Sequence, residues 1–108
     1  MIEVNGENFE QEVIKSPQPV LVDFWGRQCG PCLALMPQVE VLSEKYRDRV
    51  KVTKVEAPKS RRLCLNLRVM GLPTFLFYKD GQEVVRLTGN ITIRSIEDSL
   101  NKLLESSG

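Results

Sequence analysis

Two cysteines, Cys29 and Cys32, are the residues whose types and spacing most directly suggest chemistry. They lie where a run of apolar residues gives way to a segment with helical periodicity. Side chains three residues apart on a helix share one face at about 5–6 Å, and a disulfide needs Cα atoms about 4.4–6.8 Å apart. The spacing therefore predicts a pair that opens and closes as a disulfide with little backbone movement.

The expected helix start gives the two cysteines different roles. Free backbone N–H groups and the helix dipole would stabilise a thiolate at Cys29, and the thiolate is the attacking species in disulfide exchange. Cys32 would lie one turn deeper, where it is suited to resolve a mixed disulfide. Between them, Gly30 lets a partner's backbone approach and Pro31 pre-sets φ for the first helical turn.

A Cys-x-x-Cys spacing alone also occurs in metal sites and in structural disulfides. Zinc needs four ligands, whereas this chain has three cysteines and no histidine. A metal site shared between two chains remains an alternative. A static disulfide closing so short a loop would add little stability. The redox interpretation is favoured, with no metal and no bound cofactor expected.

The composition predicts one globular domain over residues 1–108, because hydrophobic residues at 42% and charged residues at 27% are ordinary values for a single core of this length. A net charge of +1 gives no electrostatic case for nucleic acid or an anionic membrane as partner. The longest apolar runs are too short to span a bilayer. The segment Met1–Phe9 lacks the apolar stretch of a signal peptide. We therefore expect a cytoplasmic monomer.

Hydrophobic periodicity predicts the elements that would position the cysteines. Helices are expected at 8–15 with Asn8 as cap, at about 30–49 with a kink at Pro37, at 59–68, and after a Thr92 cap. Strands are expected at 20–25, 50–55, 74–78 and 83–87, the last two joined by a turn with Gly81, and Ile2–Val4 could add another. This order predicts an α/β fold with a central mixed sheet of four to five strands and helices on both faces.

Asp23 is the only charge in the apolar strand 20–25. A buried carboxylate is costly unless it is paired or protonated, and burial should raise its pKa. Lys54 has the same strand parity as Val50 and Val52, which predicts that its side chain points inward. A structural ion pair between Asp23 and Lys54 is one interpretation of these two charges.

Over essentially its whole length the sequence resembles the thioredoxin family. The motifs that carry the resemblance are Asp23-Phe-Trp25, Cys29-Gly-Pro-Cys32, Pro37, Gly71-Leu-Pro-Thr-Phe75, Lys79-Asp-Gly81 and Gly89. The resemblance implies the thioredoxin fold and a protein thiol–disulfide oxidoreductase, a dithiol electron carrier that acts in electron transport and cell redox homeostasis. It also implies two kinds of partner, target proteins with disulfides and a thioredoxin reductase that is NADPH- or ferredoxin-linked.

The resemblance further implies roles for individual residues. Asp23 would help to move the proton of Cys32, and Lys54 matches the family's buried lysine. The Leu72–Pro73 bond would be cis and packed opposite the cysteines, so that the backbone near Leu72 could pair with an extended substrate. The expected substrate-binding set is Trp25, Gly30, Pro31, Met70, Gly71, Leu72, Pro73 and Gly89. Trp25 as a plain core residue is the alternative.

Three positions depart from the family pattern: Gln28 replaces Trp, Leu33 replaces Lys, and Pro58 replaces an acidic residue. Arg27 could restore the charge lost at Leu33. These changes leave open a specialised thioredoxin-like protein with one dedicated target, or a non-catalytic interaction module on the same surface. We interpret Cys64 as an inert buried side chain and the basic run 59–62 as solvated helix surface.

Overall fold

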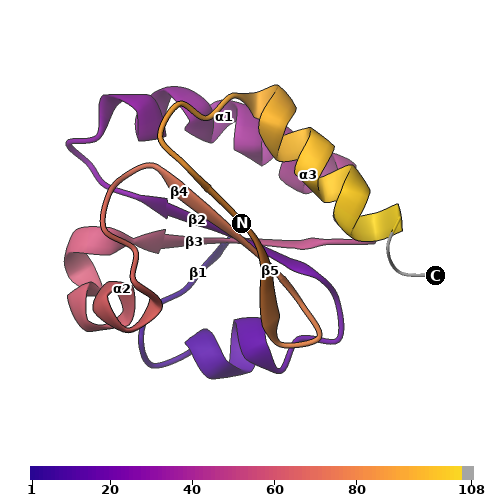
Figure 1. Cartoon of the computed structure of the whole chain (residues 1–108), viewed down its shortest axis with the longest axis horizontal. Coiled ribbons are helices and arrows are strands. Elements are labelled where there is room, and N and C mark those ends of the chain that lie inside the picture. Colours follow the sequence, from indigo (N-terminus) through magenta and orange to yellow (C-terminus); the bar gives the residue numbers. More distant parts are fainter. Residues whose placement is uncertain (106–108) are drawn as a thin grey trace.

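The five strands form one mixed sheet in a computed structural model that describes residues 1–105. Their order across the sheet is β1-β3-β2-β4-β5 (Figure 1). The strands are β1 (Ile2–Glu3), β2 (Val20–Trp25), β3 (Lys51–Glu56), β4 (Thr74–Lys79) and β5 (Gln82–Thr88). β3 runs parallel to β1 and β2, whereas β4 is antiparallel to both β2 and β5. The predicted mixed sheet is confirmed, including the short N-terminal strand.

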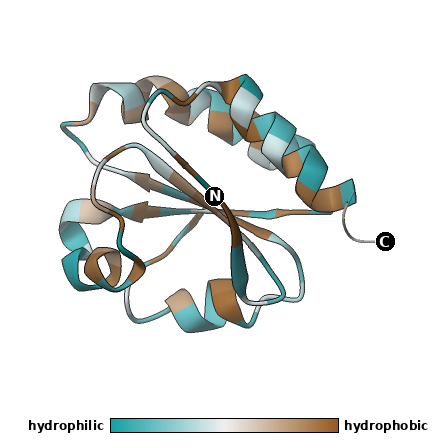
Figure 2. Ribbon diagram, in the orientation of Figure 1, coloured by the Kyte–Doolittle hydropathy of each residue, from teal (hydrophilic) through white to brown (hydrophobic). Residues whose placement is uncertain are grey.

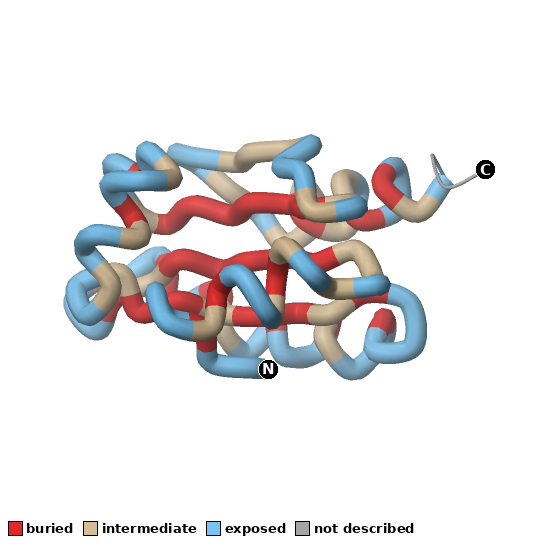
Figure 3. The backbone as a smooth tube through the Cα atoms, turned by 90° about the horizontal axis from the view of Figure 1, so that it is seen from below, coloured by how far each residue is buried: buried red, intermediate tan, exposed pale blue. Residues whose placement is uncertain are grey.

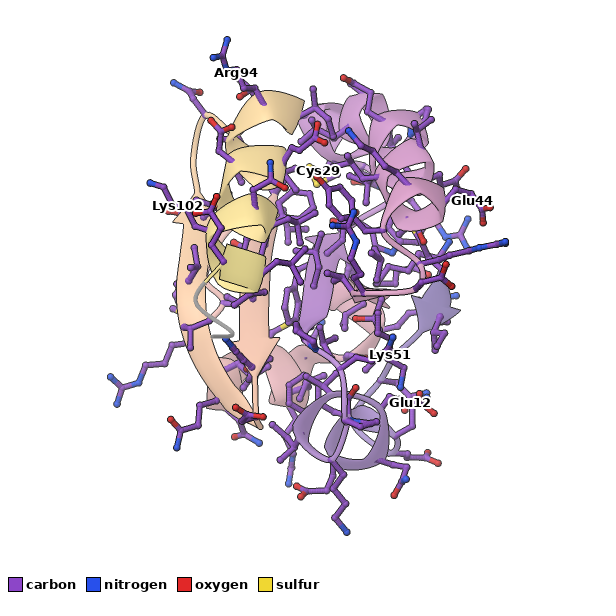
Figure 4. All side chains as sticks on the ribbon, turned by 90° about the vertical axis from the view of Figure 1, so that its right-hand side faces the viewer. Glu12, Cys29, Glu44, Lys51, Arg94 and Lys102 are labelled. Atoms are coloured by element: carbon purple, nitrogen blue, oxygen red, sulfur yellow. A yellow bond between two sulfur atoms is a disulfide. The ribbon has the colours of Figure 1, made fainter. Side chains whose placement is uncertain are left out.

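Helical segments cover both faces of the sheet (Figure 1). α1 (Gly30–Lys45) and α3 (Ile93–Glu105) pack on one face, and η1 (Glu10–Ile14) and α2 (Arg61–Leu67) on the other. η2 (Ala57–Lys59) connects β3 to α2. Glu12 and Lys51 tie η1 to β3 through an ion pair of 2.6 Å between Oε1 and Nζ (Figure 4). Within residues 1–105, no helix is long and apolar enough to cross a membrane.

β2 separates two apolar cores because its side chains alternate between the faces. Leu21 packs with α1 and α3, whereas Val20, Val22 and Phe24 pack with η1 and α2. The three inner strands, β2, β3 and β4, are the most buried part of the sheet (Figure 3). In α3 the hydrophobic residues turn toward the sheet and the hydrophilic ones away from it (Figure 2). The alternation places Asp23 on the face covered by α1 and α3.

Three predicted helix boundaries were wrong. The first helix is shorter than predicted, and Asn8 does not cap it, since η1 has no side-chain cap. Asn5 and Asn8 instead close the preceding turn: Asn5 Oδ1 accepts the N–H of Glu7 at 2.9 Å, and Asn8 Oδ1 accepts the N–H of Asn5 at 2.8 Å. α1 passes through Pro37 and ends at Lys45. The chain then turns toward β3, and the turn is closed by a hydrogen bond that the Val50 N–H donates to Tyr46 O at 2.8 Å. α2 begins at Arg61, after the tighter turn of η2.

The remaining turns follow their sequence signals. Lys79 pairs with Gln82, so the hairpin turn has two residues, Asp80 and Gly81, both with positive φ (53° and 79°). Thr92 caps α3, since its Oγ1 accepts the N–H of Ser95 at 3.1 Å. Both the turn and the cap were predicted.

Replacing Gly81 by alanine should destabilise the fold by about 2 kcal/mol, because a side chain is strained at positive φ. An added Cβ would also lie 2.9 Å from the carbonyl oxygen of Ile14 in η1. The measurement is the urea midpoint of unfolding, with Gly6→Ala as the matched control, since no heavy atom lies within 4 Å of a Cβ there. Equal midpoints for the two variants would contradict this account of the turn.

Candidate active site

The two cysteines lie where β2 ends and α1 begins. A turn over 26–28 separates Trp25 from Cys29, whose extended backbone (φ −96°, ψ 100°) immediately precedes the first residue of α1. The Cys29 N–H closes this turn by donating to Gly26 O at 3.1 Å. The start of α1, α2 and the start of β4 gather at the same end of the sheet (Figure 1). The site is therefore built by segments that meet at one end of the sheet.

Cys29 and Cys32 form a disulfide with Cα atoms 5.3 Å apart, within the range that their spacing predicts. Their exposures differ: Cys29 is half-buried, whereas Cys32 is 1% exposed. The Cys32 N–H donates to Cys29 Sγ at 3.2 Å, so a backbone donor of the first helical turn lies beside the more accessible sulfur. This donor and the helix N-terminus would stabilise a thiolate at Cys29 in the reduced form.

Asp23 lies near the end of β2, the central strand that leads to the cysteines, and is only 1% exposed. Among the described residues, neither of its carboxylate oxygens has a hydrogen-bond partner. Burial raises the pKa of Asp23 to about 7, and the charge of Lys54 opposes that rise. An acid with this pKa exchanges a proton near neutral pH, which suits general acid–base work.

Lys54 lies beside Asp23 in the register of β2 and β3 but forms no ion pair with it among the residues described. The direct structural ion pair considered from the sequence is therefore not formed. The Lys54 Nζ instead lies 5.7 Å from the centroid of the Trp25 ring, and Arg27 Cζ lies 5.8 Å from the same centroid. Two cations thus flank the indole at cation–π distances.

The residues expected to bind substrate divide into two groups. Two adjoining hollows near the disulfide are bordered by Cys29, Met70, Gly71 and Leu72. The Leu72–Pro73 bond is cis, as the resemblance implied, and Pro73 is buried. Five of the eight expected residues, all of which lie within the described range 1–105, do not border these hollows: they are Pro73, the half-buried Trp25, and the exposed Gly30, Pro31 and Gly89.

Sequence reasoning missed the ion pair between Arg27 and Glu56. The Arg27 Nε lies 2.8 Å from Glu56 Oε2, and Lys59 Nζ lies 3.6 Å from Glu56 Oε1. Because Glu56 offsets the charge of Arg27, Arg27 does not simply restore the charge lost at Leu33. The partners are 29 residues apart, so only the pairing of Trp25 with Glu56 across β2 and β3 could have indicated the contact.

Cys64 lies on α2, 8% exposed, with its Sγ 4.0 Å from the carbonyl oxygen of Ala57. Burial raises the pKa of the Cys64 thiol, which lowers its reactivity as a nucleophile. The structure therefore supports its interpretation as an inert side chain. Over residues 1–105, no group of three or more His, Cys, Asp or Glu side chains is placed to hold a metal ion.

Comparison with known proteins gives one consistent result. The family model described as Thioredoxin matches residues 1–102. The chain is 40% identical over 105 residues to "Thioredoxin" of Acetoanaerobium sticklandii, covering 96% of this chain and 100% of that protein. It is 37% identical over 101 residues to "Thioredoxin 1" of Synechococcus elongatus, covering 94% of each. "Thioredoxin X, chloroplastic" of Arabidopsis thaliana is 37% identical over 96% of this chain and 58% of that protein.

Proposed function

This chain belongs to the thioredoxin family, and we propose that it reduces disulfides of target proteins through Cys29 and Cys32 and is then regenerated by a reductase. Thiol–disulfide oxidoreductase activity is the property of the family as a whole. The observation that carries the proposal is the disulfide at the start of α1, which joins an accessible sulfur to a buried one.

In the first step the thiolate of Cys29 attacks one sulfur of the target disulfide. A bond forms between Cys29 Sγ and that sulfur, the target S–S bond breaks, and the second target sulfur leaves as a thiolate that takes up a proton. The N–H of Cys32 and the helix N-terminus favour the attacking thiolate. Because Cys29 is the more exposed sulfur, this assignment agrees with access to a large substrate.

In the second step Cys32 resolves the mixed disulfide. Asp23, ionised above its pKa of about 7, accepts the proton of the Cys32 thiol, and the thiolate attacks Cys29 Sγ. The bond from Cys29 to the target breaks, the target sulfur that it held leaves as a thiolate that takes up a proton, and the target departs as a dithiol. Two electrons have passed to the target, and the Cys29–Cys32 disulfide is restored. Lys54 acts through its charge on Asp23.

An extended target segment would dock across the site. We propose that the backbone near Leu72 and Pro73 pairs with it, while Met70, Gly71, Trp25, Gly30, Pro31 and Gly89 form the surrounding surface. The carrier would act as a cytoplasmic monomer in cell redox homeostasis. Turnover with NADPH-linked and ferredoxin-linked reductases would identify the electron donor.

The test of this function is the reduction of insulin by dithiothreitol. We expect catalytic amounts of the protein to shorten the lag before the insulin B chain precipitates, in proportion to protein concentration, because the dithiol transfers electrons faster than dithiothreitol alone. A lag that does not change with protein concentration would contradict the function and favour a non-catalytic interaction module.

A further inference from the structure

A continuous groove runs from the disulfide along α2. Its first part, about 560 Å³, is bordered by Cys29, and its second part, about 440 Å³, by Leu65 and Met70. Both parts share Pro58, Arg61 and Leu72. We call the two parts together the α2 groove. Its floor near the cysteines is closely packed, since a Cβ on Gly26 would lie 3.2 Å from Leu72 Cδ1.

The charges along the α2 groove are not balanced. Glu56 is the acidic residue of its border, and its carboxylate is engaged by Arg27 at 2.8 Å and by Lys59 at 3.6 Å. Arg61 is exposed and forms no ion pair with any residue in the range 1–105. Since Arg61 borders both parts, one uncompensated positive charge lies at the middle of the groove.

The far part of the α2 groove is apolar. Leu65 is 68% exposed and Met70 is 83% exposed, although both are large hydrophobic residues. They lie beside Val69 and Leu72 in the same hollow. Exposed apolar side chains in a hollow that adjoins the one bordered by Cys29 suit a polypeptide partner rather than a small charged ligand.

We propose that the α2 groove selects extended target segments that carry an acidic side chain opposite Arg61. This inference rests on the proposed function, because the segment must bring its own disulfide to Cys29. Arg61 is a specificity-determining residue in this proposal: it leaves the exchange chemistry unchanged and strengthens the docking of acidic targets. The basic run that the sequence suggested to be plain helix surface thus contains a recognition residue.

The experiment compares three disulfide-linked peptide substrates that differ only in having Glu, Gln or Lys near the target cysteine. Each rate is divided by the rate with dithiothreitol alone, which corrects for the intrinsic reactivity of each disulfide. We expect kcat/KM for the Glu peptide to exceed that for the Lys peptide by about three- to tenfold, as an exposed charge contact allows. The preference should shrink as salt is raised, because salt screens exposed charges.

Two variants separate a local contact from the overall charge of the protein. Arg61→Glu should reverse the preference, so that the Lys peptide becomes the better substrate. Arg62→Glu is the matched control: it makes the same charge change on the same turn of α2, but Arg62 borders a different hollow with Asn5, Gly6 and Glu7. It should keep the preference of the unmodified protein to within about twofold.

Equal effects of Arg61→Glu and Arg62→Glu, or equal rates for the three peptides, would overturn the α2 groove proposal and leave the reductase function standing. No turnover of any peptide, together with an unchanged insulin lag, would overturn the proposed function and this inference with it. Circular dichroism of both variants checks that the fold is retained.

Discussion

Replacing Cys29 by serine should lower disulfide reduction to the dithiothreitol background. A serine hydroxyl can neither attack a disulfide nor form one, so the first step of the exchange is lost completely. The effect is measured as the insulin lag and as turnover of a peptide disulfide. The matched control is Cys64→Ser, which also removes one of the three cysteines and should keep turnover within about twofold, because the Cys64 thiol is buried on α2.

Replacing Cys32 by serine should separate the two steps. Cys29 can still attack a target, but without the resolving thiol the mixed disulfide persists. Incubation with cell extract, followed by non-reducing electrophoresis, should show covalent adducts that dithiothreitol releases. Adducts that form equally well with Cys29→Ser would contradict the assignment of Cys29 as the attacking residue.

Replacing Asp23 by asparagine should stabilise the oxidised protein relative to the unmodified protein, and this difference in stability should grow as pH rises. Burial raises the pKa of Asp23 from 3.8 in the unfolded chain to about 7 in the fold. Below pH 3.8 the group is neutral in both states, and between 3.8 and about 7 the unfolded chain ionises first, so folding becomes progressively less favourable. The stability of Asp23→Asn minus that of the unmodified protein should therefore grow by up to about 4 kcal/mol between pH 4 and pH 8.

Urea unfolding at a series of pH values measures this difference. Asp48→Asn, which neutralises an exposed carboxylate in the turn after α1, is the matched control and should show little pH-dependent difference. Parallel pH curves for Asp23→Asn and the unmodified protein would show that Asp23 has an ordinary pKa and would remove the basis for its role.

The same substitution should slow resolution of the mixed disulfide by about a hundredfold at pH 8, because the carboxylate that accepts the Cys32 proton is gone. In the unmodified protein the resolution rate should rise with pH through about 7, as Asp23 ionises. In Asp23→Asn this inflection should disappear. Stopped-flow measurement of target release separates this step from the attack by Cys29. A variant with a changed stability curve but normal resolution kinetics would leave Asp23 with a structural role alone.

The sequence predicted the fold well where its signals are local. The apolar run 20–25 predicted the strand that is β2, and the helical periodicity after the Thr92 cap predicted α3. Thr92 and Gly81 marked a cap and a turn because their requirements involve residues within three positions. Helix ends were predicted less well: α1 stops at Lys45 through a turn that directs the chain into β3, and such packing leaves no clear local signal.

What the sequence determined by itself is the chemistry of the pair. The spacing of Cys29 and Cys32 at a helix start fixes the distance between them, since that distance follows from local helix geometry. The lone charge of Asp23 in an apolar strand likewise fixed the direction of its pKa. These properties depend on neighbours along the chain.

Only the tertiary structure decided what surrounds the pair. The register of β2 and β3 sets Asp23 beside Lys54 without an ion pair, and Arg27 reaches Glu56 across 29 positions. The α2 groove joins the cysteine loop to Arg61 and Met70, which no periodicity relates. These contacts depend on how separate elements pack at one end of the sheet. The target choice that we propose would therefore originate in tertiary packing, whereas the spacing of the two cysteines originates in one helical turn.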